Sequence, residues 1–285
     1  MVSPVRKKQA VEYVINQRLC SVRRACRYLA VHRSTYRYQA QELKPKQLQL
    51  HQRIIGLSWE HPRYGYRRIR ALLMGEGWSV SRKQVQRVRC KEGLKVPSKP
   101  KRESRQGNST GLPTKATHPN HVWTWDFIFD RTDKGSTLKM LTMLDEYTRQ
   151  CLVIRVERQI QSKQVFETLL QAMATYAVPE HIRSDNGSEF IAHTIQQGLK
   201  DHQIKTLYID PGSPWQNGYI ESFHSRFRDE CLNREWLLNL REARIVIEDW
   251  RQHYNKERPH SQLGYTSPEK FKLNQKVSPQ VGQNG

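Results

Sequence analysis

IRSDNGSEF (residues 182–190) and IDPGSPWQNGYIESFHSRFRD (residues 209–229) are the two ends of the stretch that decides the fold. They carry two isolated acids, Asp185 and Glu221, among small, polar or turn-forming residues where a core would need apolar ones. A third acid, Asp126, lies upstream in the aromatic run HVWTWDFIFD, which is typical of a buried strand. A buried carboxylate is costly unless it is paired or bound to a metal ion. Three carboxylates brought together can hold two divalent cations, the arrangement used for in-line phosphoryl transfer.

The residues around these acids predict an α/β core. Strands are expected at HVWTWDFIFD, TLKMLTMLDE, CLVIRV, HIRSD and IKTLYI, and helices over residues 162–176, over residues 188–200 and around Glu221. One acid then lies on the first strand, one after the fourth and one on the last helix. This order is that of an RNase H-like fold, in which a mixed five-stranded sheet is flanked by helices. Two other acids, Asp145 and Asp210, are interpreted as turn or cap residues.

The net charge of +21 lies entirely in the N-terminal part of the chain. Residues 1–118 hold 27 Lys and Arg against 6 Asp and Glu, whereas residues 119–285 hold 21 of each. A basic module joined to a near-neutral one is expected of a protein that binds a polyanion such as DNA. A generic solubilising charge is the alternative, but such a charge is rarely so one-sided.

The basic part predicts a small all-α DNA-binding region. Residues 1–44 are expected to be helical with a possible helix-turn-helix, and residues 45–96 to form a helix-turn-helix domain. In the second of these, Ser81 is expected to cap a short helix with its apolar residues inward and its basic residues outward. The side chains predicted to contact DNA from this helix are Arg82, Lys83, Arg87 and Arg89.

The remaining boundaries follow from composition. Residues 97–117 are rich in Pro, Gly, Ser, Thr and basic residues and are interpreted as a basic linker. Residues 118–277 are expected to form the catalytic domain, and residues 278–285 a tail. The five cysteines are scattered, so they predict neither a disulfide framework nor a cysteine-based zinc domain.

Several motifs together resemble the retroviral-integrase superfamily with its DDE catalytic core, and most closely the downstream reading frame of insertion-sequence transposases of the IS3 family. They are VWTWDF, IRSDNGSEF, the spacer to Glu221, DPGSPWQNGYIESFHSRFRDE and YNKERPHSQLGYTSPEKF. The resemblance implies that Asp126, Asp185 and Glu221 are the catalytic, metal-binding acids. It also implies two Mg²⁺ ions, with Mn²⁺ as a substitute, and DNA cleavage at element ends followed by transfer of the 3′-hydroxyl.

Further DNA contacts are expected in the catalytic domain. Arg228 follows Glu221 by seven residues, so both are expected on one helix face, with Arg228 beside the scissile phosphate. Lys256 and Arg258 are predicted to grip backbone phosphates. Trp215 is predicted either to stack on an unpaired base or to pack on the core.

The expected partners are double-stranded DNA, both element ends and target, and further copies of the chain on that DNA. Relatives join such a chain to the product of an upstream frame, which is a further expected partner. No apolar run approaches the ~20 residues of a membrane span, and a cytoplasmic, nucleoid-associated protein is expected. The alternative functions are a non-catalytic DNA-binding regulator of transposition and an RNase H-like nuclease.

Overall fold

The computed structural model describes residues 3–39, 44–96, 114–185, 187–209 and 217–277. The chain divides into two compact units, residues 1–52 and residues 53–285. Most of the predicted linker, together with Trp215, Asp210 and the predicted tail, lies outside the described residues. No helix in the described part is both long enough and apolar enough to cross a membrane.

The first unit contains the three short helices that the sequence predicts. They are α1 (Pro4–Asn16), α2 (Val22–Tyr28) and α3 (Arg33–Arg37). Val11, Ala25 and Cys26 are buried and form the centre of their small core. Ala30 has a positive φ of 49° and lies in the turn between α2 and α3.

The second helical group begins with α4 (Pro45–Glu60), which crosses the boundary between the units, and continues with α5 (Tyr66–Gly75) and α6 (Arg82–Lys91). Ile69 and Leu73 of α5 and Val85 of α6 are completely buried, as their helical spacing predicts. The Ser81 hydroxyl accepts a hydrogen bond from the backbone N–H of Gln84 at 3.2 Å, which confirms the predicted cap.

The core of the second unit is a mixed five-stranded sheet of order β3-β2-β1-β4-β5. Its strands are β1 (Val122–Arg131), β2 (Thr137–Asp145), β3 (Cys151–Glu157), β4 (His181–Ser184) and β5 (Lys205–Tyr208). The first three strands form an antiparallel meander, and β4 and β5 extend it in parallel from β1. The five predicted strands, in their predicted sequence along the chain, and the predicted mixed sheet are therefore confirmed.

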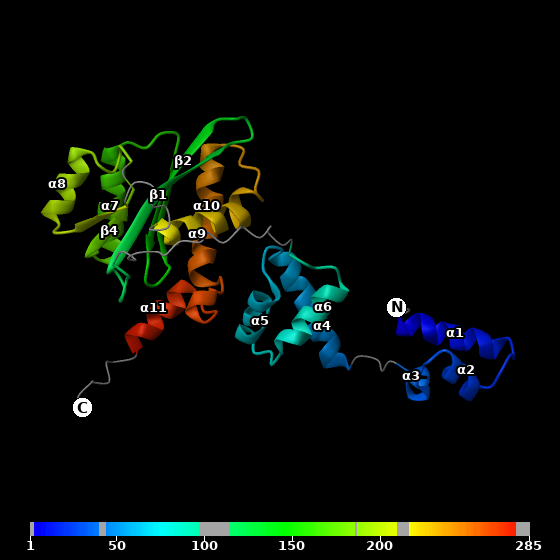
Figure 1. Cartoon of the computed structure of the whole chain (residues 1–285). Coiled ribbons are helices and arrows are strands. Elements are labelled where there is room, and N and C mark those ends of the chain that lie inside the picture. Colours follow the sequence, from blue (N-terminus) through cyan, green and yellow to red (C-terminus); the bar gives the residue numbers. More distant parts are fainter. Residues whose placement is uncertain (1–2, 40–43, 97–113, 186, 210–216, 278–285) are drawn as a thin grey trace, which may run out of the picture. The chain divides into compact units, whose positions relative to one another are not determined.

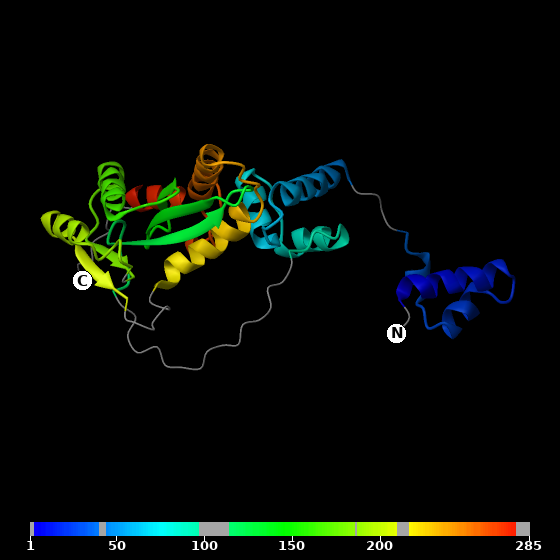
Figure 2. The ribbon, with the colours of Figure 1, turned by 90° about the horizontal axis from the view of Figure 1, so that it is seen from above.

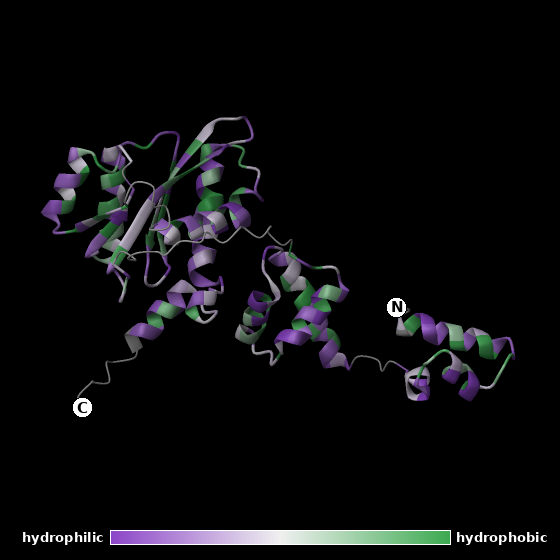
Figure 3. Ribbon diagram, in the orientation of Figure 1, coloured by the Kyte–Doolittle hydropathy of each residue, from purple (hydrophilic) through white to green (hydrophobic). Residues whose placement is uncertain are grey.

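Helices cover both faces of this sheet (Figures 1 and 2). One face packs on α7 (Ser162–Tyr176) and α8 (His193–Asp201), and the other on α9 (Gly218–Phe227) and α10 (Leu240–Lys256). The helix expected from residue 188 begins only at His193. Green and purple residues share the helical ribbons in Figure 3, as expected for helices with one face on a core.

The chain after α9 continues without leaving the helical region. A π-helical turn, Arg228–Leu232, follows α9 directly, and α10 is followed by a 3-10 turn, Ser261–Leu263, and by α11 (Pro268–Val277). The π-helical turn carries the buried carboxylate of Glu230.

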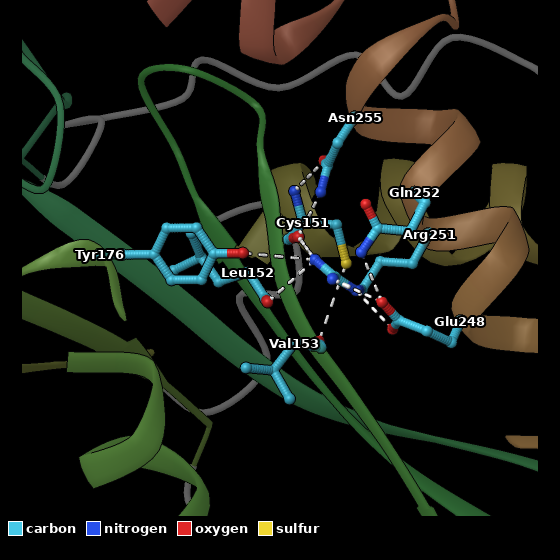
Figure 4. A network of polar contacts seen from close by, with 8 residues as sticks. All are labelled: Cys151, Leu152, Val153, Tyr176, Glu248, Arg251, Gln252 and Asn255. Atoms are coloured by element: carbon cyan, nitrogen blue, oxygen red, sulfur yellow. Dashed lines mark hydrogen bonds and ion pairs between the residues drawn. The ribbon is translucent and has the colours of Figure 1, made fainter. Parts of the chain in front are cut away.

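A polar network joins α10 to the edge strand β3 (Figure 4). Arg251 donates to the carbonyl oxygens of Cys151 and Leu152 at 2.9 and 3.1 Å and is held by Glu248 at 2.7 Å. The Asn255 side-chain amide accepts from the Cys151 N–H and donates to its C=O, both at 2.8 Å, as a neighbouring strand would. These side chains satisfy the backbone at the start of β3 and cover part of an otherwise open sheet edge.

Candidate active site

Asp126 lies in the middle of β1, opposite Thr142 of β2. Its side chain is 24% exposed, and its Oδ1 accepts a hydrogen bond of 2.7 Å from the backbone N–H of Phe127. Burial raises the pKa of this carboxyl group to about 7, and the negative charges of Asp185 and Glu221 add to the effect. The three predicted acids are therefore close enough to act on one another electrostatically.

The topology explains how the three acids come together. Asp185 directly follows β4, which runs parallel to β1, and its Oδ1 accepts from the N–H of Gly187 at 3.1 Å. Glu221 lies in the first turn of α9, where it is exposed and close to the positive end of the helix dipole. α9 packs on the face of the sheet to which Asp126 points. The first turn of α9 therefore brings Glu221 to the same side of the sheet as Asp126.

The ligand atoms of the three acids do not all lie within coordination distance of one ion. Among the described residues, the only group of three His, Cys, Asp or Glu whose ligand atoms all lie within 4.8 Å of one another is His121, Glu180 and His181. The oxygen atoms of Asp126, Asp185 and Glu221 are thus spread more widely than this. Carboxylates that repel one another are expected to hold such a spacing until cations draw them together.

His224 of α9 is the ionisable side chain next to Asp126. Its Nδ1 lies 3.8 Å from Asp126 Oδ2, and its Nε2 lies 2.8 Å from the Thr142 hydroxyl. Since that hydroxyl donates its hydrogen to the Asp126 carbonyl at 3.0 Å, it must accept from the Nε2–H of His224. Burial, together with the charge of Arg228, lowers the pKa of His224 to about 4, so the imidazole is neutral and does not compensate the acids.

The aromatic residues that flank Asp126 in the sequence do not enclose its side chain. Trp123 and Trp125 are buried, but they belong to the core on the α7 and α8 side, whereas alternation along β1 points Asp126 to the α9 side. Phe129 is 53% exposed. Asp145, by contrast, has the predicted turn role, because it accepts hydrogen bonds from the N–H groups of Asn120 and Tyr147 at 3.0 and 2.8 Å.

Four residues of the catalytic domain are predicted to contact DNA. Two of them are exposed, one is buried, and Trp215 lies outside the described residues. Arg228 and Lys256 are exposed, and Arg228 Nη2 donates to the carbonyl of Phe129 at 3.1 Å. Arg258 is completely buried and makes two hydrogen bonds, of 2.6 and 2.7 Å, with Glu230. The prediction that Arg258 grips a phosphate is therefore wrong, because its charge is satisfied inside the protein.

A similar correction applies to α6. Arg82, Lys83 and Arg87 are exposed, as expected for a basic face. Arg89 is only 5% exposed, and its guanidinium donates to the carbonyl of Leu94 at 2.8 and 3.1 Å. Arg89 thus satisfies the backbone just after its own helix and does not belong to the outward basic face.

The sequence interpretation missed a basic cavity of about 400 Å³ that lies beside α9. Arg149, Arg183 and Arg226 contribute to its wall, and the Arg149 guanidinium lies 3.9 Å from the centre of the Tyr219 ring. Arg183 is paired with buried Glu146 at 2.7 Å. Arg149 lies in a loop, Arg183 on β4 and Arg226 on α9. Because these positions are far apart in the sequence, no local pattern groups them.

Comparison with known proteins places this geometry among mobile-element proteins. Two models described as "Integrase core domain" match residues 116–214 and 202–268, and one described as "HTH-like domain" matches residues 45–102. The chain is 38% identical over 273 residues to an insertion element IS476 protein of Xanthomonas euvesicatoria, which covers 96% of this chain and 78% of the relative.

The comparison also found more distant similarities. A putative transposase for insertion sequence element IS150 of Escherichia coli is 27% identical over 264 residues, which cover 88% of this chain and 93% of the relative. A simian T-cell lymphotropic virus intasome structure aligns with a TM-score of 0.47 at 15% identity, over 73% of this chain and 70% of that chain.

Proposed function

The chain belongs to the IS3 family of insertion-sequence transposases and is a DNA transposase, and we propose that it cleaves DNA at the ends of its element and joins the new 3′-hydroxyl ends to target DNA. The convergence of Asp126, Asp185 and Glu221 is the observation that carries this proposal. Each carboxylate adds negative charge to a place where Asp126 is already partly desolvated. Such a site is poised for cations rather than for a protein counter-ion.

The donor set fits Mg²⁺ or Mn²⁺. All three proposed ligands are carboxylates, which are the oxygen donors that these hard cations prefer. Of the ion pairs among the described residues, the only one that involves these acids is the contact with His224, which is neutral. We propose that Asp126, Asp185 and Glu221 hold two ions, which when bound activate the attacking water or 3′-hydroxyl and stabilise the leaving oxygen.

The chain's own side chains prepare this site. Asp126 titrates near neutral pH, so its ionisation is coupled to cation binding. Neutral His224, fixed by Thr142, keeps a lone pair toward Asp126 without adding a positive charge. Arg228 is exposed and acts electrostatically on His224, so it is well placed to contact a DNA phosphate beside the acids.

DNA binding by the N-terminal part is supported by the HTH-like match and by the exposed basic face of α6. We propose that Arg82, Lys83 and Arg87 contact the element ends, with Lys256 gripping a backbone phosphate elsewhere. Replacing Arg87 by alanine is expected to make the affinity for element ends less dependent on salt concentration, by the amount that corresponds to losing about one phosphate contact. The matched change at Arg89 is expected to reduce stability instead, because that guanidinium is buried.

The test of the activity is a cleavage and strand-transfer assay with labelled element-end DNA and Mg²⁺. Asp185→Asn and Glu221→Gln are expected to abolish cutting and joining while DNA retention survives. Glu235→Gln, a matched change at an exposed acid, is expected to keep both activities. Two ends must be joined, so active complexes are expected to contain more than one copy of the chain.

Three results would overturn the proposal. The first is that the Asp185 or Glu221 variant still cuts and joins ends. The second is that wild-type protein retains element ends without Mg²⁺-dependent cutting, even when the product of the upstream frame is present, which would support a non-catalytic regulator. The third is cleavage of RNA–DNA hybrids without any joining, which would support a nuclease.

A further inference from the structure

A second cluster of ligand-type side chains lies at the other end of the same two strands. His121 directly precedes β1, His181 opens β4, and Glu180 precedes His181. Their ligand atoms all lie within 4.8 Å of one another. The backbone fixes this arrangement, because the N–H of His181 donates to the carbonyl of His121 at 3.0 Å where the two parallel strands begin to pair.

The cluster is separate from the catalytic acids. Asp126 follows His121 by five residues, and Asp185 follows His181 by four. At a rise of about 3.3 Å per residue, the two groups of side chains are roughly 13–17 Å apart along the strands. An ion bound at one group is therefore not shared with the other.

We propose that His121, Glu180 and His181 bind one divalent transition-metal ion, with Zn²⁺ as the best match. Two imidazoles and one carboxylate are a common ligand set for Zn²⁺, whereas Mg²⁺ prefers oxygen ligands alone. Three protein ligands leave a fourth tetrahedral position for water or for a further side chain.

The surroundings of the three residues favour a metal ion over a simple ion pair. The Nδ1 atom of His181 is buried and has no hydrogen-bond partner within the described structure. His121 directs Nε2 toward Glu180 Oε2, at 4.0 Å, which is too long for a hydrogen bond but suits two ligands of one ion. A ligand that fills this gap would satisfy both side chains.

Neighbouring residues supply the outer contacts that metal ligands usually have. His118 Nε2 lies 2.7 Å from Glu180 Oε1, so it orients the carboxylate and leaves Oε2 free to coordinate. The Thr117 hydroxyl lies 3.2 Å from His121 Nδ1. The backbone N–H of Thr117 also donates to His121 Nδ1, at 3.1 Å, and these two contacts hold the ring with its Nε2 toward Glu180.

The bound ion would cross-link His121, just before β1, to the residues at the start of β4, some sixty positions later in the sequence. His121 ends the segment that leads into β1, and Glu180 and His181 follow the loop after α7. Because such a cross-link exists only in the folded chain, its loss should appear as reduced stability of the core even when no DNA is present.

The experiment uses the full chain with Asp126→Asn and Glu221→Gln, so that the catalytic acids do not compete for the added metal. After treatment with a chelator, Co²⁺ is added and its visible absorption is recorded, and Zn²⁺ binding is measured by calorimetry and thermal unfolding. One ion per chain, a tetrahedral Co²⁺ spectrum and a rise in melting temperature with Zn²⁺ but not Mg²⁺ are expected.

Variants decide which residues bind the ion. His121→Ala and Glu180→Gln are expected to weaken binding by more than the ~10–100-fold typical of losing an outer contact. His193→Ala removes an exposed histidine from α8 and is expected to leave binding unchanged. Glu180 is exposed, so its variant should fold normally. Equal binding by Glu180→Gln and its parent, or no binding by the parent, would overturn the proposal.

Discussion

Replacing Asp126 by asparagine should stabilise the metal-free protein at neutral and alkaline pH while abolishing its catalytic activity. The carboxyl group is ionised in the unfolded chain above its ordinary pKa of 3.8, but burial and two neighbouring acids raise its pKa to about 7 in the folded protein. The folded state therefore binds more protons than the unfolded state between these two values. The free energy of unfolding falls as pH rises through this window and is constant above it.

The size of the effect follows from the two pKa values. Their difference corresponds to ~4 kcal/mol above pH 7, which is an upper limit because the side chain is 24% exposed and partly screened by solvent. The change with pH is a more direct quantity. From pH 6 to pH 8, wild type should lose ~1.4 kcal/mol relative to Asp126→Asn, because the titration is nearly complete above pH 8.

The assay is urea unfolding of both proteins with EDTA at pH 6, 7 and 8, followed by tryptophan fluorescence. Trp123 and Trp125 are buried on the same strand as Asp126 and report directly on the loss of this core. Comparing two proteins at each pH cancels the titration of groups they share. Asp130→Asn, on the same strand, controls for the loss of one negative charge.

A gap between wild type and Asp126→Asn that does not widen from pH 6 to pH 8 would refute the reasoning. It would mean that the carboxylate is compensated within the folded protein, and the case for cation binding would fail with it. A further check is addition of Mg²⁺ at pH 8, which should stabilise wild type and leave the variant unchanged.

Lowering the pH from 8 to 6 should raise the Mg²⁺ concentration for half-maximal strand transfer by about tenfold, because Asp126 must be ionised to bind a cation; a metal requirement independent of pH would contradict this. Arg258→Ala should reduce the free energy of unfolding by up to ~3–5 kcal/mol, because it removes the two shorter hydrogen bonds of buried Glu230 and leaves only Arg68, at 3.2 Å, as its partner; an unchanged urea midpoint would contradict it. Gly198→Ala should cost ~1–3 kcal/mol in the same measurement, because its Cβ would lie 2.2 Å from the Phe166 ring.

The fold was largely predictable because its signals are local. Alternating or continuous apolar runs give the five strands, and Gly, Pro and Asn-Gly positions separate them. Ser81 signals its helix start through one hydroxyl, which forms the expected hydrogen bond. The start of α8 was placed five residues too early, because apolar Phe190 and Ile191 fit a helical period although they precede the helix.

The site was only partly predictable because burial depends on partners far away in the sequence. Asp126, Asp185 and Glu221 stand out as acids in the wrong surroundings, and the topology brings them together. Arg258 resembles any exposed basic residue until Glu230, twenty-eight positions earlier, is packed against it. The grouping of His121 with Glu180 likewise depends on the parallel pairing of β1 with β4, which no short motif encodes.

Two buried glutamates show how Asp126 differs from carboxylates that have a structural role. Glu146 is paired with Arg183 at 2.7 Å. Glu230 is paired with Arg258 at 2.6 Å; although burial alone would raise its pKa, the hydrogen bond from Arg258 holds that pKa below the ordinary value.

Asp126 has no arginine partner. It accepts one backbone hydrogen bond, faces two further acids and lies beside a histidine that burial keeps neutral. Two buried glutamates are thus neutralised by arginine and buried Asp145 is held by backbone N–H groups, whereas Asp126 has no cationic partner and faces two further acids. Because an uncompensated carboxylate costs stability, this arrangement supports the proposed binding of divalent cations, whose positive charge is opposite to that of the three acids.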